Sequence, residues 1–130
     1  MLDYACHAEE LLIYLSSIDP KILILNGDIL DTKMMRNNYF PPSHIKVIKK
    51  VFSLASKGTE VHFITGNRDE HFRNLDDVYM GTIKFSNHLS LLLNGKNTLF
   101  FHGDIFDFSF SLSHWLLKLG SFGLNTLLKL

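Results

Sequence analysis

The sequence predicts an α/β domain whose sheet contains strands of mixed direction. Segments with apolar residues at helical spacing alternate with short, continuous apolar runs, which are typical of strands buried on both faces. An Asn94-Gly95 pair between two such runs predicts an antiparallel hairpin, which would give a mixed sheet. With 130 residues, the chain is long enough for one core and too short for two ordinary domains. We therefore expect residues 1–130 to form a single domain.

Helices are expected where apolar residues recur at intervals of three and four. The first spans His7–Ile18 and ends at Asp19-Pro20, because the residue before a proline avoids the helical region. The second spans Ser43–Ser56, with Ser43 as its capping residue. The core-facing residues expected in the second helix are Ile45, Ile48, Val51, Phe52 and Ala55. A third helix is expected over Ser109–Leu119.

The strands are expected in the apolar runs Lys21–Asn26, Val61–Thr65, Gly81–Phe85, Leu89–Leu93 and Thr98–Phe101. Between the first strand and the second helix, the polar and aromatic stretch Thr32–Pro42 is expected to be a loop. Long loops that follow a strand are more often functional than idle. A polar stretch also separates the second strand from Asp77.

Composition excludes some classes of protein. The 13 basic and 13 acidic residues cancel, so there is no general electrostatic reason to expect a nucleic-acid partner. The one cysteine, Cys6, excludes an internal disulfide and a thiolate metal cage, and it fits a reducing compartment. The sequence shows neither a signal peptide nor an apolar run of ~20 residues. We therefore expect a cytoplasmic protein, with peripheral contact to the inner membrane as an open alternative.

Three strands are followed by a glycine beside a polar residue. The runs are ILILNGD, VHFITGN and TLFFHGD, and they bring Asp28, Asn67 and His102 to one sheet edge if the strands lie side by side. A carboxylate, an amide oxygen and an imidazole suit a divalent ion such as Mn²⁺, Fe²⁺ or Zn²⁺. Each residue also has a plainer interpretation. Asp28 could cap a helix or turn, Asn67 could belong to a polar turn, and His102 could be a packed histidine.

These motifs resemble a known family. GDxxD at Gly27–Asp31, GNRD at Gly66–Asp69 and HGD at His102–Asp104 resemble the inner motifs of the calcineurin-like metallophosphoesterases. CHAEELL, PPSHIKVIKK, KGTEVHFITGNRDEHFR and FFHGDIFD are similar to the UDP-2,3-diacylglucosamine pyrophosphohydrolase group of lipid A biosynthesis. The resemblance implies part of a four-layer α-β-β-α sandwich with mixed sheets. It also implies a hydrolase that splits its lipid-nucleotide substrate into lipid X and UMP.

The resemblance also implies a role for each matching residue. Two divalent ions, with Mn²⁺ the first choice, would be held by Asp28, Asn67 and His102, with Asp28 bridging them. The residues expected to orient these ligands are Asp31, Asp69 and Asp104. The residues expected to take part in catalysis are Asn67, Arg68 and Asp69, and those expected to contact the phosphate-containing substrate are Arg68, His44 and Arg73. Arg68 would stabilise phosphate charge and could not donate a proton at neutral pH.

Two motifs of the family, Asp-x-His and Gly-His-x-His, are missing from these residues. On this ground we expect the chain to be an internal piece of a longer protein that binds metal poorly and turns over little. The alternative function is a degenerate, non-catalytic module that contacts a protein or a membrane surface. The aromatic residues from Phe106 to Trp115 are most simply core packing, and the alternative is an apolar groove for acyl chains.

Overall fold

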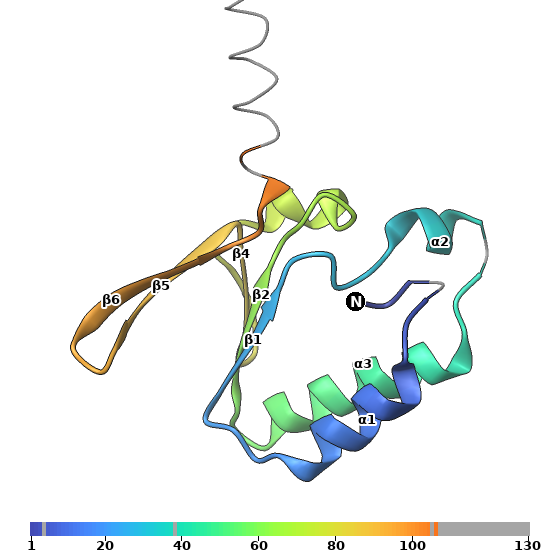
Figure 1. Cartoon of the computed structure of the whole chain (residues 1–130), viewed down its shortest axis with the longest axis horizontal. Coiled ribbons are helices and arrows are strands. Elements are labelled where there is room, and N and C mark those ends of the chain that lie inside the picture. The colour runs from blue at the N-terminus through green and yellow to red at the C-terminus, as the bar shows by residue number, and fades with distance from the viewer. Residues whose placement is uncertain (4, 38, 105, 107–130) are drawn as a thin grey trace, which may run out of the picture.

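The computed structural model describes residues 1–3, 5–37, 39–104 and 106 of the chain (Figure 1). The helix expected over Ser109–Leu119 lies outside the described residues, as does nearly all of the aromatic segment from Phe106 to Trp115. Within the described part, no helix is both long enough and apolar enough to cross a bilayer.

The described residues form an α/β structure with a mixed sheet, as the sequence predicts. The elements are α1 (Ala8–Ser17), β1 (Ile22–Asn26), α2 (Thr32–Arg36), α3 (Pro42–Ser56), β2 (Glu60–Ile64), the 3₁₀ helix η1 (Glu70–Leu75), β3 (Val78–Met80), β4 (Ile83–Ser86), β5 (His88–Leu93) and β6 (Lys96–Phe101). The main sheet has the order β1-β2-β4-β3, in which β1, β2 and β4 are parallel and β3 is antiparallel to β4. β5 and β6 form a separate two-stranded antiparallel sheet that turns at Asn94-Gly95, as expected.

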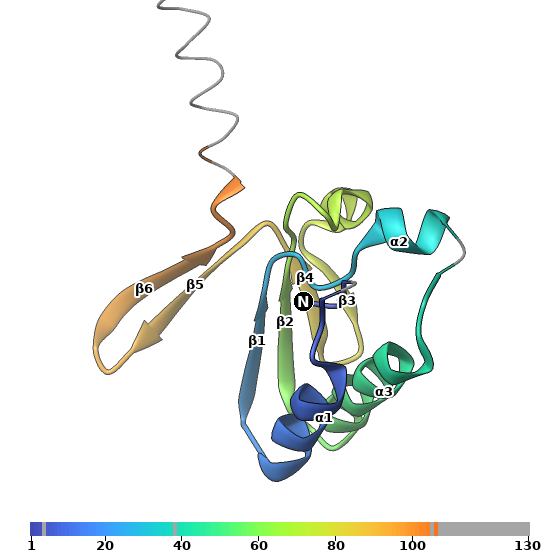
Figure 2. The same cartoon turned by 45° about the vertical axis from the view of Figure 1, so that its right-hand side comes forward.

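Helices α1 and α3 lie side by side on one side of the main sheet, and the β5-β6 hairpin extends away on the other (Figures 1 and 2). Leu25, Phe63 and Phe85 are in register across β1, β2 and β4, and all three are buried in the core. The core has this composition because the apolar strands present one face to the helices. The other members of the core cluster are Leu2, Ala8, Leu15, Ile29, Val47, Val51, Leu54, Ala55, Val61 and Ile83.

The inner face of α3 differs from the expected one. The buried residues are His44, Val47, Val51, Leu54 and Ala55, so the expectation holds in full for Val51 and Ala55. Ile48 is partly buried against the core, and Phe52, although 47% exposed, lines the pocket between the main sheet and α3. Ile45 is 43% exposed, so the expectation is wrong for this residue. The helix also begins one residue earlier than expected, with Pro41 at the N-cap and Pro42 at the first helical position, where the missing amide hydrogen costs nothing.

Three short elements were not expected from the sequence. Thr32–Arg36, in the expected loop, forms α2 because the Asp31 carboxylate accepts hydrogen bonds from the amides of Lys33 and Met34. Met34 then buries its side chain almost completely. η1 lies within the polar stretch between the second strand and Asp77, and β3 follows directly after that stretch. Both lie largely at the surface.

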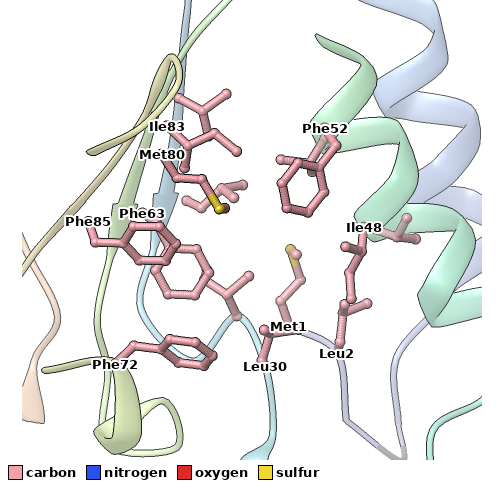
Figure 3. Close-up of a pocket in the computed structure, with 15 residues that line it drawn as sticks. Met1, Leu2, Leu30, Ile48, Phe52, Phe63, Phe72, Met80, Ile83 and Phe85 are labelled. Carbon is pink, nitrogen blue, oxygen red and sulfur yellow. The ribbon is translucent and has the colours of Figure 1, made fainter. Parts of the chain in front are cut away.

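An apolar cavity of about 170 Å³ lies between the main sheet and α3 (Figure 3). Its lining residues are Met1, Leu2, Leu25, Ile29, Leu30, Val47, Ile48, Val51, Phe52, Val61, Phe63, Phe72, Met80, Ile83 and Phe85. No polar side chain is among them, so a water molecule inside would find no partners, and such cavities stay dry.

Candidate functional site

Two of the three predicted junctions meet because their strands are neighbours. β1 and β2 run parallel in register, so Asp28 and Asn67 leave the same edge of the main sheet. The condition that the third strand lies beside the other two is not met, because β6 pairs only with β5 within the described residues. His102 nevertheless reaches the same place, since the chain returns along β6 and brings the imidazole over Gly27.

Asp28 sits in a constrained turn. Its φ is 53°, a left-handed conformation that a non-glycine residue rarely adopts, and Gly27 before it has a φ of 71°. A side chain at Gly66 would come within 2.5 Å of Asp28 Oδ1, so glycine is required there. Asp28 Oδ1 accepts a hydrogen bond from the Arg68 amide at 2.9 Å, and the amino group of Met1 donates to the Asp28 carbonyl. Strained residues held by such contacts are typical of functional sites.

His102 packs on the glycine that precedes Asp28. A Cβ at Gly27 would overlap the imidazole ring, so the ring lies directly against the backbone. His102 Nε2 faces Asp28 Oδ2 at 3.7 Å. His102 Nδ1 is buried and lies 3.3 Å from Asp104 Oδ1, although the two atoms are not aligned as a full hydrogen bond. Asp104 therefore lies beside the His102 ring, and its expected role of orienting a metal ligand stays a prediction.

Asp69 ties the first two junctions together. Its side chain is 0% exposed and accepts hydrogen bonds from the amides of Ile29 at 2.8 Å, Leu30 at 2.6 Å and Gly66 at 3.4 Å. Burial raises the pKa of this carboxyl above its usual value, while the three backbone donors act in the opposite direction. Asp69 is thus placed to orient the Asp28 loop, and its burial gives no support to a direct contact with a substrate.

Arg68 faces a cluster of carboxylates at the surface. Its Nη1 lies 3.0 Å from Asp31 Oδ2 and 3.5 Å from Asp3 Oδ2, and its Nε lies 3.9 Å from Asp28 Oδ2. Asp31 thus serves both this cation and the N-terminus of α2. Sequence reasoning missed Asp3, which reaches the cluster because Leu2 forms a parallel bridge with Leu30, a pairing that no local motif reveals.

An open, polar pocket of about 350 Å³ is lined by Asn67, Glu70, Arg73 and Asp104. Glu70 was not among the expected site residues, although its position directly after GNRD was an available signal. Arg73 was expected to contact substrate, and in the structure its Nη2 donates to Asp104 Oδ2.

His44, also expected to contact substrate, is only 3% exposed on the inner face of α3. Its ring packs edge-to-face on Phe40, and its Nδ1 has no hydrogen-bond partner among the described residues. Burial lowers the pKa of His44 below its usual value. This position gives no support to a substrate contact.

The donor set around Asp28 fits one divalent ion in part. Asp28 Oδ2 and His102 Nε2 face each other across 3.7 Å, within the span of two ligands that each lie about 2.0–2.2 Å from one ion. Within the described residues, no group of three or more His, Cys, Asp or Glu side chains is arranged to hold a metal. A complete site would therefore need further donors, and the expected role of Asn67, an amide ligand, stays a prediction.

Comparisons with protein-family models, with curated proteins and with solved structures return no match to this chain. The chemistry of the site is therefore argued from its own residues. These are the exposed Arg68, Asp28 with its strained backbone, and the His102 imidazole within 4 Å of the Asp28 carboxylate.

Proposed function

We propose that the protein is a metal-dependent hydrolase of phosphate esters or diphosphates. The observation that carries the proposal is the approach of His102 Nε2 to Asp28 Oδ2 at 3.7 Å, with the Arg68 guanidinium on the same carboxylate oxygen at 3.9 Å. This places a nitrogen donor, an oxygen donor and a phosphate-binding cation around one point. Those three groups are what a metal-assisted phosphoryl reaction requires.

Asp28, Asn67 and His102 would hold the metal. Their oxygen and nitrogen donors suit Mn²⁺, Fe²⁺ and Zn²⁺, and the resemblance makes Mn²⁺ the first choice. Two ions fit the proposal, because a carboxylate such as Asp28 can offer one oxygen to each. When bound, such ions lower the pKa of a coordinated water and polarise a phosphoryl oxygen. Asp69 and Asp104 would hold Asp28 and His102 in place, as their contacts with the Asp28 loop and the His102 ring suggest.

Arg68 would bind the phosphate. Its guanidinium is permanently charged and can fork onto two phosphate oxygens, so it stabilises developing negative charge and supplies no proton. It is 46% exposed at the side chain and lies beside Asp28, where a substrate can reach it. A leaving group that needs no protonation suits this arrangement. A diphosphate that releases UMP has one, which agrees with the resemblance to UDP-2,3-diacylglucosamine hydrolases.

The second candidate is a non-catalytic module built on the same scaffold. It is favoured by the lack, among the described residues, of three facing His, Cys, Asp or Glu donors. The positive φ of Asp28 argues against it, because a scaffold gains nothing from holding a strained residue with its carboxylate beside an imidazole.

The test measures Mn²⁺ binding by calorimetry, together with hydrolysis of bis(p-nitrophenyl) phosphate and of UDP-2,3-diacylglucosamine. Because the described donors make up only part of a metal site, we expect weak Mn²⁺ binding and slow turnover in the unmodified protein, and Asp28→Asn and His102→Ala should abolish both while the protein stays folded. The matched controls are Asp77→Asn and His88→Ala, which change exposed residues outside the site and should leave both quantities unchanged. Metal binding or turnover that survives in the site variants contradicts the proposal. A protein with neither supports the non-catalytic module.

A further inference from the structure

Four side chains form a continuous series of contacts at the edge of the site. Arg73 Nη2 donates to Asp104 Oδ2, Asp104 Oδ1 lies 3.3 Å from His102 Nδ1, and His102 Nε2 lies 3.7 Å from Asp28 Oδ2. From this series we infer that Arg73 is a positioning residue, which sets the orientation and tautomer of His102 through Asp104. The inference rests on the proposed function for its purpose, although the effect on His102 can be measured without any metal.

The two oxygens of the Asp104 carboxylate have different neighbours, and this gives the physical reason for the positioning role. Its side chain is only 9% exposed, so each oxygen needs a partner within the protein. Arg73 occupies Oδ2, which fixes the plane of the carboxylate and keeps Oδ1 beside His102 Nδ1 at 3.3 Å, where the two atoms are close but not aligned as a hydrogen bond. Arginine suits this task because its planar guanidinium keeps its charge and holds a carboxylate in a defined direction.

The consequence for His102 follows from which nitrogen carries the proton. A carboxylate can only accept, so a neutral imidazole gains from Asp104 only when the proton is on Nδ1. Nε2 then presents its lone pair, and Nε2 is the nitrogen that faces Asp28. Loss of Arg73 would free the Asp104 carboxylate to turn toward the open pocket lined by Asn67 and Glu70, and both tautomers of His102 would become populated.

Two other roles for Arg73 make different predictions. As a surface ion pair it would contribute only about 0–1 kcal/mol to stability and would not affect His102. As a substrate ligand, the role expected from the sequence, it would change the KM of the hydrolysis reaction and leave the imidazole unaltered. The tautomer of His102 separates both from the positioning role.

The experiment records ¹⁵N spectra of the histidine side chains in the metal-free full chain, with the His102 signals assigned from His102→Ala. We expect the Nδ1-protonated form in the unmodified protein and a mixture of tautomers in Arg73→Gln. Arg73→Lys keeps the charge without the planar fork, so it should restore the Nδ1-protonated form only in part. Mn²⁺ affinity, measured separately by calorimetry, should fall about 10–100-fold in Arg73→Gln and by less in Arg73→Lys. Arg36→Gln is the matched control, because Arg36 is an exposed arginine that contacts a different histidine, His71.

An unchanged His102 tautomer in Arg73→Gln overturns the inference. A raised KM with an unchanged tautomer also overturns it, assigns Arg73 to the substrate and leaves the proposed function intact. If the unmodified protein neither binds Mn²⁺ nor hydrolyses a diester, the proposed function fails, while the tautomer still reports on Arg73. Arg73→Met, which keeps the aliphatic stem, carries the same test should Arg73→Gln not fold.

Discussion

Gly27 shows how closely single residues determine this site. It lies beneath the His102 ring, adopts a positive φ and precedes the strained Asp28, so three requirements meet at one position. Gly66 plays the same part on the neighbouring loop, where a side chain would meet Asp28. Both glycines could be noticed in the sequence as the ends of apolar runs. The reason for them could not, because the ring and the carboxylate that exclude a side chain come from distant parts of the chain.

Gly27→Ala should therefore disrupt the site as well as the turn. The positive φ alone should cost alanine about 1–2 kcal/mol, and displacement of the His102 ring should cost about 1–3 kcal/mol more. Gly95→Ala is the control, since Gly95 has a φ of 76° and nothing lies within 4 Å of an added Cβ. Chemical unfolding and Mn²⁺ calorimetry check this. Equal losses of stability, with metal binding retained in both variants, would contradict the proposed packing.

At the level of elements, the short helix α2 connects local capping to the site. Asp31 accepts from two amides at the start of α2 and also pairs with Arg68, so one carboxylate fixes both the helix and the guanidinium that we propose to bind phosphate. The helix is only five residues long and would be unstable without its cap and the buried Met34.

Asp31→Ala and Asp31→Asn separate these two contributions. Asparagine keeps the capping oxygen and loses the charge, whereas alanine loses both. We expect Asp31→Ala to lower the free energy of unfolding by about 1–2 kcal/mol and Asp31→Asn by no more than about 1 kcal/mol. Urea denaturation of the two variants gives the comparison. Identical losses would show that the pair with Arg68, and not the cap, accounts for the effect.

The sequence predicted the long elements better than the short ones for a physical reason. Apolar runs and helical spacing predicted α1, α3, β1, β2, β4 and the hairpin nearly in full, because burial of many apolar side chains determines those elements. The short strand β3 is exposed, α2 depends on one cap and η1 on local turns, so none of the three has a periodic signal. Ile45 was wrongly expected to face the core because α3 contains more apolar residues than its inner face holds.

The site was predictable in the same uneven way. Asp28 and Asn67 could be placed together because the carboxyl ends of adjacent parallel strands coincide. The convergence of His102 was expected for the wrong reason, because β6 does not join the main sheet. Asp3 and the engagement of Arg73 by Asp104 depend on tertiary contacts alone, and no spacing in the sequence indicates them.

For the molecule as a whole, the main sheet and α3 enclose a cavity that is not completely filled. The described part of the chain shows an α/β arrangement of three α-helices, a mixed sheet and a hairpin, whereas the complete four-layer sandwich stays a prediction. The cavity is lined by apolar side chains only, so the atoms around it lack van der Waals contacts on one side. A larger apolar side chain can restore those contacts and stabilise the fold.

Val51→Ile should stabilise the protein by up to about 0.8 kcal/mol, the value of one buried methylene group. Val51 is 8% exposed and lines the cavity, so the added group enters empty space. Val78→Ile makes the same chemical change at an exposed strand position and should leave the melting temperature nearly unchanged. Calorimetric melting curves compare the two variants. Destabilisation by Val51→Ile would mean that the cavity is not available to a methyl group.

Asp69 has a consequence for how this protein responds to heat. Its carboxylate accepts hydrogen bonds from the amides of Ile29 and Leu30, about forty positions earlier in the chain, and from the amide of Gly66. The turns after β1 and β2 are therefore held by the same side chain. Opening of either turn breaks hydrogen bonds that also hold the other in place. Warming should therefore leave the two turns intact together until they are lost in one cooperative event, while the exposed turn of the β5-β6 hairpin loosens earlier.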